Sequence, residues 1–146
     1  MKDKYKDIKK YLNRAYRLTQ TRDKLEREYE KKQKEVGNIS VSNSEIKSNK
    51  IISNVENKAI ELISLKNNID LHNIKIEELK KEISCVISRV EDENLRDLLR
   101  LRYLEFRKWE DIAYILHYSR RNVFYARDRA LKEVEKILKD CTALHF

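Results

Sequence analysis

Proline is absent from the sequence, and Gly37 is the only glycine among 146 residues. A sheet-rich domain needs such residues at its hairpin turns, so their scarcity argues against a β-rich fold. Aromatic residues are also few, at 8%, whereas charged residues make up 40% of the chain. The composition therefore predicts an all-α protein built from long, uninterrupted helices.

The sequence also lacks motifs for metal binding and catalysis, and segments for export or membrane insertion. Cys85 and Cys141 lie far apart without the spacing of metal ligands, which is typical of free thiols in a reducing cytoplasm. No nucleophile stands beside a plausible base, no glycine-rich phosphate loop occurs, and the three histidines are scattered. No apolar run reaches the roughly 18 residues of a membrane span, and no signal peptide is recognisable. We expect a cytoplasmic, non-enzymatic protein with no catalytic residues, metal or cofactor.

The charge that is present is mostly positive, with a net value of +8. Such an excess favours a polyanionic partner, either a nucleic acid or an anionic membrane surface. Residues 119–132 hold five basic and one acidic side chain (net +4), and residues 1–36 hold 13 basic and 7 acidic side chains (net +6). The C-terminal segment, and also the N-terminal helix, could therefore follow a line of phosphates.

Residues 2–36 contain no helix breaker and carry one seam with heptad spacing. The seam consists of Tyr11, Ala15, Leu18, Arg22, Leu25, Tyr29, Lys32 and Val36. Gly37 suits the C-cap of this helix. The Ser- and Asn-rich residues 37–49 predict a connector, with Ser42 or Ser44 as the N-cap of a second helix.

A second seam follows between residues 45 and 90, again with steps of three or four residues. Its members are Ile52, Val55, Ala59, Leu62, Leu65, Ile69, His72, Ile76, Leu79, Ile83, Val86 and Val90. Helices on either side of a short connector usually pair antiparallel. Residues 1–90 therefore predict a long helical hairpin or the core of an intermolecular coiled coil, and a dimer joined through these helices.

The pattern changes at the acidic residues 91–94, which are typical of a helix N-terminus. We predict a domain boundary here, then a short helix from Leu95 to Tyr103 and another from Trp109 to Leu116. Ser119 is a suitable N-cap for a last helix, which reaches Ile137 or Leu138. Three short helices in this order predict a C-terminal helix-turn-helix domain over residues 91–140, followed by a tail at 141–146.

The spacing of apolar residues fits the helix-turn-helix plan. Ile112 and Ala113 fall where the two helices cross, and the small alanine lets their backbones approach. The crossing buries four further positions, which here are Leu116, Tyr118, Val123 and Ala126. His117 occupies the turn position that needs a positive φ, a conformation that histidine tolerates.

Four short stretches carry a family resemblance: LRLRY ending at Tyr103, WEDIA at 109–113, the serine–arginine pair at 119–120 and RAL at 129–131. Together, residues 92–138 resemble the fourth region of bacterial sigma factors, which reads a promoter element. With its long basic helices, the whole chain is similar to small sigma-like regulators encoded by phages and prophages, some of which activate late genes. The N-terminal 90 residues lack the aromatic-rich helix with which true sigma factors melt promoters.

A recognition helix presents its first side chains to base edges in the major groove. The resemblance implies base contacts for four residues, with Asn122 beside them: Arg120, Arg121, Phe124 and Tyr125. Phosphate contacts are expected from the helix start and its cations: Ser119, Arg127, Arg129 and Lys132. Arg121 and Tyr125 stand where the family has an acidic residue and a glutamine, so the promoter preference of sigma factors is not expected here.

The sequence thus predicts a sequence-specific DNA-binding transcription regulator of phage type, which reads promoter or operator DNA with residues 119–138. Double-stranded DNA is the expected partner, RNA polymerase is a second candidate, and no membrane partner is expected. Two alternatives stay open. One is a small terminase subunit that packages phage DNA as a ring, and the other is a coiled-coil adaptor whose C-terminal helices bind protein.

Overall fold

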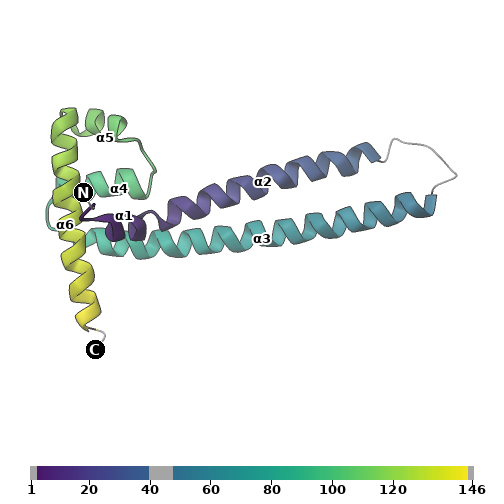
Figure 1. The fold of residues 1–146 in the computed structure, drawn as a ribbon, viewed down its shortest axis with the longest axis horizontal. Helices are drawn as coiled ribbons and strands as arrows, with labels where there is room; N and C mark the ends of the chain where they lie inside the picture. The colour runs from purple at the N-terminus through teal and green to yellow at the C-terminus, as the bar shows by residue number, and fades with distance from the viewer. Residues whose placement is uncertain (1–2, 40–47, 145–146) are drawn as a thin grey trace. The chain divides into compact units, whose positions relative to one another are not determined.

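The computed structural model describes residues 3–39 and 48–144. In these residues it contains six helices and no strand, which confirms the all-α prediction (Figure 1). The helices are, in chain order, α1 (Lys6–Leu12), α2 (Arg14–Ile39), α3 (Ser48–Ser88), α4 (Glu93–Tyr103), α5 (Trp109–Leu116) and α6 (Arg120–Leu144). A search of the described helices finds none that is long and apolar enough to cross a membrane.

The chain forms two compact units, and both α2 and α3 contribute to each of them. The first, called here the helix-turn-helix unit, comprises residues 1–17 and 76–146. The second, the hairpin unit, comprises residues 18–75. The boundary that we predicted between residues 90 and 91 lies inside the helix-turn-helix unit, because α1 and the last part of α3 supply core residues to it.

In the hairpin unit, α2 and the first part of α3 lie side by side and run in opposite directions (Figure 1). The long helices therefore pair within one chain, as a helical hairpin. Seam residues of both helices, such as Leu25 on α2 and Ile69 on α3, are partly or fully buried, whereas most residues between them are exposed. The polar members of the first seam bond across the pair: Arg22 Nη1 donates to Asn73 Oδ1 at 3.2 Å, and Lys32 Nζ donates to Glu61 Oε2 at 3.0 Å.

The N-terminal helix differs from the prediction at both ends. Instead of one helix over residues 2–36, α1 ends at Leu12 and α2 begins at Arg14. Leu12 and Ala15 are both fully buried in the core, and Leu12 is not a member of the predicted seam. Gly37 is not a C-cap, because α2 continues to Ile39. An exposed helix tolerates one glycine at a cost of about 1 kcal/mol. The N-caps expected at Ser42 or Ser44 lie outside the described residues.

Apolar residues from all six helices build the core of the helix-turn-helix unit, with α2 contributing through Ala15 at its start. Fully buried members include Leu12 of α1, Ile83 and Ile87 of α3, Leu98 and Leu99 of α4, Ile112 of α5, and Ala126, Ala130, Leu131 and Val134 of α6. The acidic cluster caps α4 as predicted, since Asp92 Oδ1 accepts from the backbone N–H groups of Asn94 (2.9 Å) and Leu95 (3.3 Å).

The last helix runs further than predicted. We expected it to end at Ile137 or Leu138, but α6 continues to Leu144. Ile137 and Leu138 pack against the core, and Arg89 Nη1 donates to Cys141 Sγ at 2.6 Å one turn later. These contacts keep one side of the helix attached beyond the predicted end.

Candidate nucleic-acid interface

The link between α5 and α6 is a left-handed turn at His117, with φ 59° and ψ 39°. The N–H of His117 donates to the Tyr114 carbonyl at 3.3 Å, and the N–H of Tyr118 donates to the Ala113 carbonyl at 2.8 Å. This pair of bonds is a Schellman closure, which usually has glycine at the left-handed position. The positive φ predicted for His117 is therefore confirmed.

Ser119 begins the next helix, as its sequence position indicated. Its Oγ accepts a hydrogen bond from the backbone N–H of Asn122 at 3.1 Å, which satisfies one of the free amides at the helix start. α6 consequently starts at Arg120, only three residues after the left-handed turn.

The predicted crossing of α5 and α6 is also present. Ile112 is fully buried and Ala113 nearly so, and on α6 Val123 and Ala126 are buried as well. Leu116 and Tyr118 are half-buried and pack against the same core. These contacts fix the two helices against each other, so the start of α6 is held on a rigid support.

The open face of α6 carries six of the predicted DNA-binding residues, which are all exposed: Arg120, Arg121, Asn122, Tyr125, Arg129 and Lys132. Arg121 and Tyr125 interact with each other, because Arg121 Nε donates to the Tyr125 hydroxyl at 3.1 Å and its guanidinium lies 5.5 Å from the ring centroid. Asp128, which the sequence interpretation left out, is exposed on the same helix.

Phe124 and Arg127 lie at the junction of α5 and α6 and are only partly exposed. The Phe124 ring is 6.1 Å from Trp109, and the Arg127 guanidinium lies over both rings, 5.0 Å from Phe124 and 6.0 Å from Trp109. Arg127 Nη2 also pairs with Asp128 Oδ1 at 3.1 Å. Both predicted DNA contacts thus have partners within the domain, and their binding to DNA stays a prediction.

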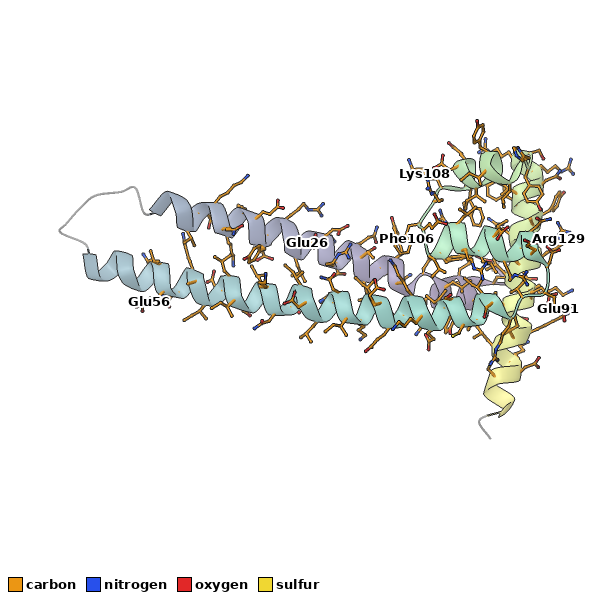
Figure 2. The ribbon with its side chains drawn as sticks, turned by 180° about the vertical axis from the view of Figure 1, so that it is seen from behind. Glu26, Glu56, Glu91, Phe106, Lys108 and Arg129 are labelled. Carbon is orange, nitrogen blue, oxygen red and sulfur yellow. The ribbon has the colours of Figure 1, made fainter. Side chains whose placement is uncertain are left out.

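A hollow of about 540 Å³ opens beside this junction, and the sequence interpretation missed two of its cations. Arg102, Lys108 and Arg120 line it together with Trp109 and Phe124, against a single carboxylate, Glu110. Figure 2 shows Lys108 at the beginning of α5, where it precedes the helix and makes no side-chain cap hydrogen bond. A cation directly before the first helix of the pair was the signal in the sequence that could have identified Lys108.

Arg129 and Lys132 border a second hollow, which is shared with acidic residues. Its lining includes Glu91, Asp92 and Glu133, and Figure 2 shows Glu91 and Arg129 near each other. Nearby carboxylates therefore offset more of the positive charge of Arg129 and Lys132 than of Arg120 and Arg121. In the described part of the chain, no group of His, Cys, Asp or Glu side chains is arranged to hold a metal ion.

Comparison with known families gives one match. A family model described as a protein of unknown function, DUF1492, matches residues 51–135, which is more than half of the chain. The chain belongs to this family. The DUF1492 region includes most of α3, all of α4 and α5, and α6 as far as Glu135. No curated protein and no solved structure matches the chain.

Proposed function

We propose that this DUF1492 protein is a sequence-specific DNA-binding transcription regulator of phage type, which reads promoter or operator DNA with α6. One observation carries the proposal: a left-handed turn at His117 and the Ser119 cap present Arg121 and Tyr125 on the first turns of a rigidly held helix. In helix-turn-helix proteins this end of the second helix enters the major groove. The phage type and RNA polymerase as a second partner rest on the resemblance to sigma-like regulators.

Base recognition is assigned to the open face of α6. The Arg121 guanidinium can donate two hydrogen bonds to O6 and N7 of a guanine, and the Tyr125 ring can contact the methyl group of a thymine. Arg121 is already held by the Tyr125 hydroxyl, so less side-chain entropy is lost when it meets a base. Arg120 and Asn122 flank this pair on the same turn of helix.

Phosphate contacts are assigned to cations around the base-reading face. Lys108 stands at the start of α5, and the first helix of the motif crosses the DNA backbone. Arg102 and Arg120 share the hollow beside it. Contacts of this kind position the protein and release counterions but carry no sequence information.

The proposal is tested by selecting bound sequences from a random duplex pool near physiological ionic strength, about 0.15 M. The wild-type chain should enrich one motif, and the variant Arg120→Ala/Arg121→Ala should lose it. The matched control, Lys136→Ala/Lys139→Ala, removes two cations from the far end of the same helix and should enrich the same motif as wild type. Failure of the wild-type chain to enrich any motif, or an unchanged motif in the Arg120/Arg121 variant, would overturn the proposal.

A further inference from the structure

The hairpin unit has a row of exposed aliphatic side chains on α3. Ile60, Ile63, Leu71 and Ile74 are 64%, 62%, 65% and 58% exposed. Single exposed aliphatic residues are ordinary, but an aligned row of them marks an interaction surface. At about 100° per residue these four side chains and Asn67 lie within about 40° of one line along the helix. We call this row the outer stripe.

The outer stripe does not take part in the pairing of α2 with α3. The inner seam of α3 is formed by other residues, such as Leu65 and Ile69, which are partly or fully buried. Because the inner seam is occupied within the chain, a dimer that forms through these helices has to use another face. The outer stripe is the exposed aliphatic row that α3 offers in this unit.

The spacing of the residues in the stripe is the same in both directions. The steps from Ile60 to Ile63, Asn67, Leu71 and Ile74 are three, four, four and three residues, with Asn67 at the centre. An antiparallel pair of identical helices has a two-fold axis, so the same surface has to match itself when it is reversed. A row of aliphatic residues whose spacing is symmetric about one residue meets this condition.

We propose that α3 pairs antiparallel with α3 of a second copy of the chain, with Asn67 opposite Asn67. In this register, Ile60 faces Ile74 of the other copy and Ile63 faces Leu71. Each Asn67 amide has both donors and an acceptor, so the two amides can bond to each other. A single polar residue in such a seam fixes the register and the number of helices. This inference concerns self-association and does not depend on DNA binding.

One pair of opposite charges beside the stripe agrees with this register. Lys66 and Asp70 lie on the same flank of α3 and are exposed, and neither forms an ion pair within the described chain. With Asn67 opposite Asn67, Lys66 of each copy lies near Asp70 of the other, so the two-fold axis creates two ion pairs.

The oligomeric state of the full chain tests the proposal, measured by sedimentation equilibrium. The wild-type chain should be a dimer, and Ile63→Asp/Leu71→Asp should raise the dissociation constant more than about 100-fold, because it places carboxylates opposite each other in the seam. The matched control, Gln20→Asp/Asn68→Asp, adds two carboxylates at exposed positions of the same hairpin and should stay dimeric. Circular dichroism should show unchanged helix content in both variants. The proposal is wrong if the wild-type chain is monomeric, or if Ile63→Asp/Leu71→Asp is as dimeric as the control.

The register is tested by disulfide trapping in a Cys85→Ser/Cys141→Ser background. A mixture of the Ile60→Cys chain and the Ile74→Cys chain should form a crosslinked heterodimer, because the proposed register brings these positions together. Each chain alone should crosslink poorly. If each chain alone crosslinks well and the mixture gives no heterodimer, the helices pair in parallel and the antiparallel register is wrong.

Discussion

Arg121 lies against the ring of Tyr125 on the exposed face of α6, with Nε donating to the Tyr125 hydroxyl at 3.1 Å. The two residues are one helical turn apart, so the contact follows from the four-residue spacing alone. It orders the guanidinium while the N–H groups at its tip stay available for another acceptor. The pair is therefore arranged in advance for a base edge.

Arg121→Ala should weaken binding to the selected DNA motif by about 1–3 kcal/mol, roughly 5- to 150-fold, and relax the preference at one base position. Tyr125→Phe keeps the ring and loses the hydroxyl that holds Arg121, so a smaller loss of up to about tenfold is expected. Fluorescence anisotropy with the motif and with each single-base variant measures both effects. An equal loss on every duplex after Arg121→Ala would show that this residue contacts phosphate.

His117→Gly should stabilise the protein, because the left-handed conformation costs a side-chain-bearing residue about 1–2 kcal/mol that glycine does not pay. The larger entropy of glycine in the unfolded chain reduces the gain to about 1 kcal/mol or less. His117→Val should destabilise, since a β-branched residue tolerates a positive φ poorly. Urea unfolding of the three proteins gives the order Gly, His, Val. The reverse order would show that the His117 ring contributes more than its backbone costs.

Ser119→Ala should lower the free energy of unfolding by about 1 kcal/mol, because the N–H of Asn122 loses its acceptor. Ser119→Asp keeps an acceptor at the N-cap and should unfold close to wild type. The same aspartate should weaken DNA binding, because its charge repels phosphates. Thermal unfolding combined with anisotropy separates the two effects. Normal DNA affinity in the aspartate variant would place Ser119 away from the phosphates.

Burial raises the pKa of the Tyr103 phenol above its ordinary value of 10.0. As the pH rises, the Tyr103 phenol therefore loses its proton in the unfolded chain before it does so in the folded protein. The stability that the neutral phenol contributes is complete below pH 10.0 and is lost as the pH rises through the folded pKa. Tyr103→Phe should flatten this alkaline loss, measured as the urea midpoint between pH 8 and 11. Tyr114→Phe, which removes a hydroxyl from an 85% exposed side chain, is the control and should keep the wild-type slope.

Local signals were sufficient for most of the helix-turn-helix. The Ser119 cap, the Asp92 cap and the positive φ of His117 each depend on residues a few positions apart, so they can be recognised in the sequence. The pairing of the long helices within one chain could not be predicted. A heptad seam satisfies an intramolecular partner and an intermolecular one equally well.

The remaining differences depend on contacts between distant segments. Leu12 is buried against a core that the C-terminal helices build, and no residue beside it in the sequence predicts this contact. Lys108 and Arg102 meet Arg120 only after three helices have packed. The outer stripe is different, because its spacing was visible in the sequence. Ile63 and Leu71 share α3 with a longer apolar seam, and the sequence alone does not show which of the two rows stays exposed.

Lys108→Ala should change the salt dependence of DNA binding and leave the motif unchanged. Each phosphate contact contributes about −0.9 to the slope of log K against log salt concentration, so losing one should make the slope shallower by that amount. Lys136→Ala removes an exposed cation from the end of α6 and should leave the slope as it is. The measurement is an anisotropy titration at several salt concentrations. A changed motif with an unchanged slope would instead place Lys108 at a base edge, and α5 would then share the reading of sequence with α6.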